Sequence, residues 1–449
     1  MAVPRIQNGW RFDLSISVPG YGNLSRFDPE SPLGKDQSAL AECYGAHFAY
    51  PVTNGTTSAN LIAGLTLTRP GETVLLDRSG HGSTHAMLLH NGLAPVWLMP
   101  HFSQRLGAAV GVTPEALVAA LEAHPDISLA VVTYPTYWGF GTDIQGLVRE
   151  AHRRGVRIMV DSAHGAHHPF HPAFPRSAIA AGADVVTVSL HKTLPAASQA
   201  SAIFVRDRAV FERLYEVTQA SGATSTSFSY PILLSGFQAV TIAREEGRQR
   251  FGEAILLSQR LRKALNRIPG VWSWGGKEAR AEGARAFDPL RVAADVSGLG
   301  LTGYAVERLL YRHAIYAEMA TRTSVLFLIN LCHTQEDVDR LVQCMERIAA
   351  RAPKRPLALT VPPIPAPGPM VMLPRDAFYA PRRRRVPVAE AIGRVCAETI
   401  SAYPPGAPVL CTGELITAEA VDYLKSIRAY GAGLNACDPS FGTIQIVDP

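Results

Sequence analysis

The chain has 449 residues, 47% of them hydrophobic, so it can bury a large core and is expected to divide into two or three domains. Its net charge of +5 is a small excess for this length and does not indicate a nucleic-acid-binding protein. The run Arg382–Arg385 could form an anion-binding patch, but it lacks interleaved aromatic residues and a solvated loop is favoured. No stretch approaches the roughly 20 apolar residues of a membrane helix. Six scattered cysteines without a CxxC pair predict reduced thiols and a cytoplasmic protein.

Residues 1–40 are rich in Pro, Gly and Ser and are predicted to form an arm that could cover a neighbouring subunit. A helical pattern from 38 to 48 then leads to Asn54-Gly-Thr-Thr-Ser, which opens the apolar helix 61–67. Such an opening offers Thr56 and Thr57 hydroxyls and free backbone N–H groups to a phosphate. The alternative is an ordinary helix cap by Thr or Ser.

Strands and helices alternate in the next part of the chain. The predicted strands are 73–77, 129–134 and 156–160, and the helices between them are 114–124 and 144–154. This alternation predicts parallel βαβ units in a doubly wound sheet.

Polar side chains follow these strands directly. His81 stands between glycines after the first, where it could approach a ligand or be incidental, and Asp161 follows the third. The apolar run 184–189 ends at Ser189, His191 and Lys192. A lysine that closes a buried strand is costly unless it is used covalently, most often as a Schiff base to pyridoxal phosphate. The alternative is a surface lysine in a loop.

The carboxyl ends of parallel strands meet at one edge of the sheet, so these groups are expected to lie together. An ionised Asp161 would keep the pyridine nitrogen of the cofactor protonated, and Lys192 would bond to its aldehyde carbon. Together with the Gly-Thr-Thr-Ser cup and His81, they predict a pyridoxal phosphate site. No metal-ligand spacing is present in the sequence.

The second half of the chain changes in pattern. The hydroxyl-rich segment 224–231 could cap the long helix 232–266 or complete the phosphate cup of a partner subunit. The predicted tail contains a helix at 390–401, a helix at 418–428 and a strand at 442–447. The predicted divisions are an arm at 1–40, a cofactor-binding large domain at 41–285, a small α+β domain at 286–352, a Pro-rich linker at 353–374 and a C-terminal domain at 375–449.

With these motifs, the chain resembles the Orn/Lys/Arg decarboxylase family of fold-type-I pyridoxal phosphate enzymes, in the short form without an amino-terminal wing domain. The resemblance rests on Ser189-Leu-His-Lys-Thr-Leu-Pro-Ala, Asp161-Ser-Ala-His-Gly-Ala-His, Asp77-Arg-Ser-Gly-His-Gly-Ser and Thr226-Ser-Phe-Ser-Tyr-Pro. It implies an aminotransferase-like α/β fold with a mostly parallel sheet, a small α+β domain and a C-terminal α+β domain. Substrate-side elements depart from the family, including Pro19-Gly-Tyr-Gly and Thr412-Gly-Glu.

The resemblance also implies residue roles. Lys192 would carry the cofactor, Asp161 would pair with the pyridinium, His81 would stack on the ring, and His191 would flank the cofactor linkage with a possible part in proton transfer. Thr56, Thr57 and Ser189 would hold the phosphate and His164 would line the ring edge. Glu414 or Glu318 is expected to bind the distal cation of the substrate.

The implied reaction is decarboxylation of arginine, lysine or ornithine to the amine and CO2, by at least a homodimer with shared sites and without nucleic acid or membrane partners. One alternative keeps the cofactor but acts on an unusual amino acid or with another outcome, such as transamination or oxidative decarboxylation. The other is a catalytically silent regulator that keeps the fold, against which the intact Lys192 and Asp161 weigh.

Overall fold

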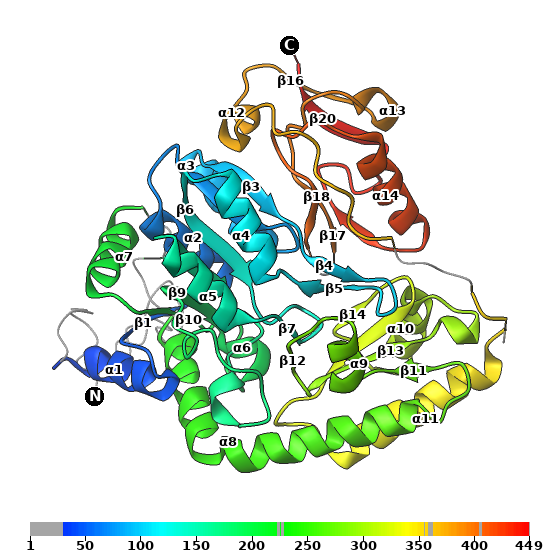
Figure 1. Ribbon diagram of the computed structural model, residues 1–449. Coiled ribbons are helices and arrows are strands. Elements are labelled where there is room, and N and C mark those ends of the chain that lie inside the picture. Colours follow the sequence, from blue (N-terminus) through cyan, green and yellow to red (C-terminus); the bar gives the residue numbers. More distant parts are fainter. Residues whose placement is uncertain are drawn as a thin grey trace, which may run out of the picture.

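The computed structural model describes residues 30–221, 225, 229–353, 355–357, 362–403 and 406–448. Figure 1 shows three parts: a large domain around a central sheet, a smaller domain joined to it by the long helix α8 (Tyr230–Leu265), and a C-terminal domain beside strand β3 (Ala94–Leu98) and helix α3 (Gly82–Asn91). Within the described residues, no helix is both long and apolar enough to cross a membrane.

The central sheet has seven strands in the order β1-β10-β9-β8-β6-β2-β3. The neighbours from β9 to β3 pair in parallel, and β10 is antiparallel to both of its neighbours. The predicted α/β fold with a mostly parallel sheet is therefore confirmed. The other strands are β1 Phe48–Val52, β2 Thr73–Asp77, β6 Ile127–Thr133, β8 Arg157–Asp161, β9 Val185–Ser189 and β10 Ser201–Val205.

Both faces of this sheet are buried, because successive apolar residues of each strand point to opposite faces. Val74 and Leu76 belong to one buried cluster, together with side chains of helices on that face, whereas Leu75 belongs to the other. The first face carries α2 (Gly55–Leu67), α3 and α7 (Arg208–Ala220). The second carries α1 (Pro32–Tyr44), α4 (Pro114–Ala123), α5 (Ile144–Arg153) and part of α8.

The predicted arm is only partly within the described structure, which begins at residue 30. Residues 32–40 belong to α1, capped by Ser31, and Leu40 and Tyr44 of this helix lie in the core. The helix predicted at 38–48 is therefore wrong at its end, because the chain turns at Gly45 and continues as strand β1. Pro51 is tolerated there because β1 is an edge strand.

The small domain is built on an antiparallel sheet in the order β11-β13-β15-β14. Strand β13 (Arg291–Asp295) lies in this sheet, and the helices of the domain include α10 (Gly303–Tyr311) and α11 (Gln335–Arg351). Strand β12 (Ala286–Phe287) pairs with β7 (Phe140–Gly141) of the large domain, so the two domains are also joined by backbone hydrogen bonds. The remaining strands are β11 Trp272–Ser273, β14 Met319–Ala320 and β15 Ser324–Leu328, and α9 spans Gly276–Ala281.

In the C-terminal domain, the predicted helix at 390–401 is wrong. The structure has a single turn, α13 (Val388–Ala391), and then strand β17 (Ile400–Tyr403). Gly393 separates them with a φ of +78°, which a continuing helix does not allow. Arg383 to Arg385 lie in the exposed strand β16 (Arg383–Pro387). The other elements are α12 Pro374–Phe378, β18 Pro408–Leu410, α14 Ala418–Ala429, β19 Gly433–Asn435 and β20 Thr443–Val447.

Candidate active site

A cavity of about 480 Å³ opens at the carboxyl ends of the central strands. Its walls come from the large domain, from β14 and α10 of the small domain, and from α14 of the C-terminal domain. Eight of the residues singled out in the sequence line it, namely Thr56, Thr57, His81, Asp161, His164, Ser189, His191 and Lys192. The structure therefore gathers groups that are up to 136 positions apart in the chain, from Thr56 to Lys192.

Lys192 lies on the single turn α6 (Leu190–Thr193), which follows β9 directly. Its Nζ is 3.2 Å from Nε2 of His164. Burial lowers the pKa of Lys192 from its ordinary value, and the negative charge of Asp161 offsets part of that effect. The amine is thus held in a site that favours its neutral, nucleophilic form more than water does.

Asp161 ends β8 and is 2% exposed. Its Oδ2 accepts a hydrogen bond of 2.9 Å from Nδ2 of Asn60, and its Oδ1 accepts one of 3.0 Å from the backbone N–H of Ala163. Asn60 is itself fixed, because its Oδ1 accepts from the hydroxyl of Thr187 at 2.6 Å. The carboxylate is therefore held in one orientation at the cavity wall.

The amino end of α2 has the features of an anion site. The N-cap position is held by Asn54, whose side chain makes no hydrogen bond to the first turn, so the helix cap by Thr or Ser that was the alternative is not formed. Thr56 Oγ1 lies 2.5 Å from Ser189 Oγ and 2.8 Å from Ser201 Oγ, while Thr57 is exposed toward the cavity. A helix amino terminus with hydroxyls beside it suits a phosphate group.

Two further histidines line the cavity. His81 precedes α3, and its Nδ1 accepts a hydrogen bond from the backbone N–H of Ser83. Burial lowers the pKa of His81; the Asp161 charge raises it and the Lys192 charge lowers it further. His191 has its Nδ1 2.9 Å from the carbonyl oxygen of Ala200, so Nδ1 carries the hydrogen and Nε2 is left as a base.

The two carboxylates that were predicted to bind the substrate, Glu414 and Glu318, are not among the residues that line the cavity. Glu414 is fully buried, and both of its oxygens contact Arg78, at 2.6 and 2.9 Å. Its carboxylate is therefore paired with Arg78 where the C-terminal domain meets the large domain. This corrects the expectation that Glu414 binds the substrate. Glu318 lies behind the cavity wall, where it accepts a 3.1 Å hydrogen bond from Tyr137, a lining residue.

Sequence reasoning missed Asn60 and Arg291. Asn60 is the one amide in the otherwise apolar middle of α2, and Arg291 begins an apolar strand, so each is a polar residue in an apolar pattern. Arg291 is fully buried and its Nη2 lies 2.8 Å from Nδ1 of His164. Of the segment 224–231, predicted to cap the long helix or to complete a partner's phosphate cup, residues 224 and 226–228 lie outside the described residues, and 230–231 begin α8.

The donor set fits pyridoxal phosphate. A half-buried lysine, a fixed carboxylate, an imidazole and a helix amino terminus line one cavity. These are the groups that would hold, in turn, the carbonyl carbon, the ring nitrogen, the ring face and the phosphate.

Family comparison agrees with this arrangement. The family profile described as "Orn/Lys/Arg decarboxylase, major domain" matches residues 7–293, and that of its C-terminal domain matches residues 365–435. The chain belongs to the Orn/Lys/Arg decarboxylase family. The family resemblance seen in the sequence motifs is thereby confirmed.

Several family members are similar over nearly the whole chain. The arginine decarboxylase of Halalkalibacterium halodurans is 32% identical over 442 residues, covering 97% of this chain and 89% of that protein. The arginine decarboxylase of Bacillus subtilis is also 32% identical, covering 93% and 85%. Among solved structures, the lysine decarboxylase of Francisella novicida superposes with a TM-score of 0.80 at 21% identity, covering 97% of this chain and 74% of that one. This last likeness shows the family fold.

Proposed function

We propose that the chain is a pyridoxal-phosphate-dependent decarboxylase that converts arginine, lysine or ornithine to the corresponding amine and CO2. The observation that carries the proposal is the convergence of Lys192, Asp161, His81 and the amino end of α2 on one cavity. Membership of a decarboxylase family supports the reaction, and relatives named as arginine and lysine decarboxylases support a basic substrate.

Each residue of the cavity has a distinct task in this reaction. Lys192 would hold the cofactor through its Nζ, Asp161 would pair with the ring nitrogen, and Thr56, Thr57 and Ser189 would bind the phosphate. When bound, pyridoxal phosphate withdraws electrons from the bond to the leaving carboxylate. Asn60 keeps the Asp161 carboxylate oriented toward the cavity through its 2.9 Å hydrogen bond.

Loss of CO2 breaks the bond from Cα to the carboxylate, and a proton must then be added at Cα. His191 and Lys192 are adjacent in the chain and both line the cavity, so either can deliver that proton. The Nδ1 contact of His191 with Ala200 leaves Nε2 to accept and release it. Apolar side chains of the cavity wall, including Met319 and Ile364, limit the access of water.

The cavity wall is rich in aromatic rings. Tyr137, Trp138, Tyr304 and Tyr423 line it, and rings of this kind attract an ammonium or guanidinium group. Among the described lining residues, Asp161 is the only carboxylate. Glu318 remains a candidate for binding the distal charge, since its carboxylate accepts a hydrogen bond from the lining residue Tyr137.

We also propose that the active unit is at least a homodimer in the cytoplasm. The support is the family resemblance, in which sites are shared between subunits. Light scattering of the purified chain tests this directly, and a monomer that retains full turnover would contradict it.

The test of function is a panel of arginine, lysine and ornithine, scored for both CO2 and amine by mass spectrometry. We expect at least one of the three to give equal amounts of both products. Lys192→Ala should abolish turnover and the visible absorbance of the bound cofactor. Lys263→Ala, which removes an exposed lysine of α8, is the matched control and should leave both unchanged.

Other results identify the alternatives. A ketone or aldehyde product with consumption of O2 would indicate oxidative decarboxylation, and an oxo acid without CO2 would indicate transamination. If the wild-type chain is colourless with added cofactor and inert toward the panel, the proposal fails and a silent regulator is favoured.

A further inference from the structure

A series of polar contacts runs inward from Lys192. Its Nζ is 3.2 Å from Nε2 of His164, and Nδ1 of the same ring is 2.8 Å from Nη2 of Arg291. Nε of Arg291 lies 3.7 Å from Oδ2 of Asp288, which in turn lies 3.2 Å from Nε2 of His167. His164, Arg291, Asp288 and His167 are all buried.

The small domain supplies Arg291, since this residue begins β13. The side chain of Arg291 packs against the backbone of Gly139, which has a φ of +82°. Any larger residue at this position would clash with it, because a Cβ there would lie 2.4 Å from Cγ of Arg291. The segment is further fixed by the hydrogen bond from the Asp288 N–H to the Gly139 carbonyl. Arg291 is therefore held against His164 by backbone contacts between the two domains.

The chemistry of this series fixes where the hydrogen of His164 lies. A guanidinium donates hydrogen bonds and cannot accept them, so Nδ1 of His164 must be the acceptor. Burial and the nearby charge of Arg291 lower the pKa of His164 well below its ordinary value, and Nδ1 carries no hydrogen because it accepts from Arg291, so the ring is neutral. A neutral ring that accepts at Nδ1 carries its hydrogen on Nε2.

The Nε2–H group points at Nζ of Lys192. An ammonium group would place a second donor against it, whereas a neutral amine accepts the hydrogen bond. We propose that Arg291 is a positioning residue that keeps the hydrogen of His164 on Nε2. The Nε2–H group then stabilises the neutral amine form of Lys192. This inference rests on the proposed role of Lys192 as the amine that bonds the cofactor.

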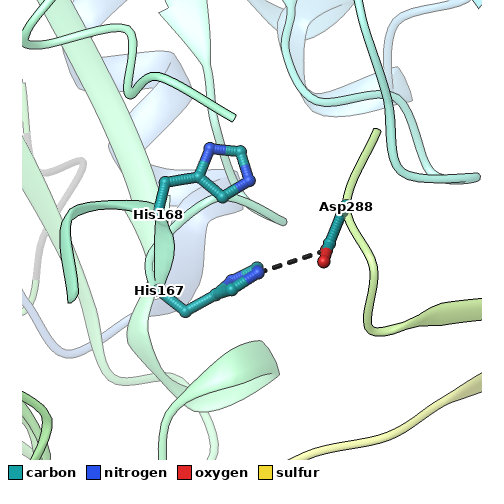
Figure 2. A group of neighbouring side chains, drawn as sticks. All are labelled: His167, His168 and Asp288. Carbon is teal, nitrogen blue, oxygen red and sulfur yellow. Dashed lines mark ion pairs between the residues drawn. The ribbon is translucent and has the colours of Figure 1, made fainter. Parts of the chain in front are cut away.

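The inner end of the series is formed by His167, His168 and Asp288. Figure 2 shows His167 pointing at Asp288, with the ring of His168 beside them. These residue types also bind metal ions, but the charge of the buried Arg291 lies 3.7 Å from the same carboxylate oxygen. A divalent ion would add two positive charges beside that guanidinium in a site without solvent, which is costly. We therefore assign Asp288 to charge compensation of Arg291.

Charges from several elements act on Lys192. Burial lowers its pKa, Asp161 raises it, Arg291 lowers it and Glu318 raises it. His81 is also close enough to interact with the amine. Arg291 and Glu318 thus act in opposite directions, which gives a pair of substitutions with opposite expected effects.

The experiment measures the proton affinity of Lys192 without turnover. Full-length protein freed of cofactor is labelled with trace acetic anhydride at a series of pH values, and labelling of Lys192 is compared with that of exposed Lys263 by mass spectrometry. Wild-type Lys192 should reach half-maximal labelling at a lower pH than Lys263. Arg291→Met should move that midpoint up by about one pH unit, a tenfold loss of neutral amine at about pH 7.5.

Glu318→Gln should move the midpoint in the opposite direction, and Arg291→Lys, which keeps a cation, should stay near wild type. Glu318 is 29% exposed in its side chain, so this variant keeps the test valid if Arg291→Met does not fold. In a His164→Phe background the effect of Arg291→Met should fall by at least half, because the hydrogen-bond path is gone.

The inference is overturned if Lys192 labels like Lys263, if Arg291→Met leaves the midpoint unchanged, or if Glu318→Gln raises it. An undiminished effect in the His164→Phe background would mean that charge alone acts and would reject the assigned hydrogen position. The outcome is separable from that of the proposed function, because labelling needs no substrate. A shifted midpoint in a chain that decarboxylates none of the panel would support the positioning role and reject the function.

Discussion

Two arginines in this chain are fully buried beside carboxylates, and they are bound in different ways. Arg78 contacts both oxygens of Glu414, at 2.6 and 2.9 Å, and also donates to the carbonyl oxygen of Val409 at 2.8 Å. Its guanidinium stacks on Trp97 with 4.4 Å between the guanidinium carbon and the ring centroid. Arg291 has no carboxylate oxygen closer than 3.7 Å among the described residues, and its short contact is with His164.

The difference shows how one residue type serves architecture in one place and chemistry in another. The partners of Arg78 all come from the segment 409–414 and from its own domain, so it fastens the C-terminal domain to the loop that carries His81. The partners of Arg291 come from three elements and include a side chain that touches Lys192. A charge that is compensated at longer distance remains available to act on its neighbours.

The largest expected effect is on stability, and it separates the two arginines. Arg78→Met leaves the Glu414 carboxyl group buried without its partner, so we expect a loss of about 3–5 kcal/mol in the free energy of unfolding. Arg291→Met should cost less, roughly 1–3 kcal/mol, because Asp288 keeps the backbone N–H of Leu290 and the imidazole of His167. Urea denaturation followed by circular dichroism measures both.

The double variant Arg78→Met/Glu414→Leu is the control for this comparison. It removes both buried charges, so it should recover part of the stability that Arg78→Met loses. If Arg291→Met proves as destabilising as Arg78→Met, the distinction between a fastening arginine and a positioning arginine is wrong.

Most strands of the central sheet, and the gathering of the candidate site residues at their ends, could be predicted from the sequence. Strands 73–77 and 185–189 are mostly apolar runs, and their carboxyl ends place His81 and Lys192 without further information. The strand at 48–52 was missed because Tyr50-Pro51 resembles a turn, and only its edge position allows the proline.

The role of Glu414 could not be predicted for a different reason. Arg78 and Glu414 are 336 positions apart, and nothing local in either segment indicates that they meet. Glu414 belongs to the segment Thr412-Gly-Glu, which the family resemblance places on the substrate side, so a contact with the substrate was predicted. Arg291 was hidden in the same way, since its partner His164 lies in another domain.

A smaller effect concerns pH, and here the two regions should behave alike. Each holds a buried neutral histidine: His85 beside Arg78 and His168 beside Arg291. Burial lowers the pKa of both to about 3, and in each case the neighbouring arginine contributes to the lowering. Between about pH 6.5 and 3 the unfolded chain binds a proton at each histidine that the folded chain does not. The contribution of each neutral histidine to the free energy of unfolding is therefore fully present above about pH 6.5. Below that pH the free energy of unfolding falls by about 1.4 kcal/mol per pH unit for each histidine.

His168→Phe tests this with little change in packing, because the ring lies near Tyr134 and Phe174 and neither of its nitrogens has a hydrogen-bond partner among the described residues. The slope of unfolding free energy against pH between about pH 6 and 4.5 should decrease by about 1.4 kcal/mol per pH unit. His85→Phe should decrease it by a similar amount. His81 and His164 remain in both variants, and their lowered pKa values leave a residual slope in the same direction. If only one of the two substitutions flattens the slope, the other histidine is protonated in the folded chain. The charge of its neighbouring arginine is then compensated more completely than the contacts described above imply.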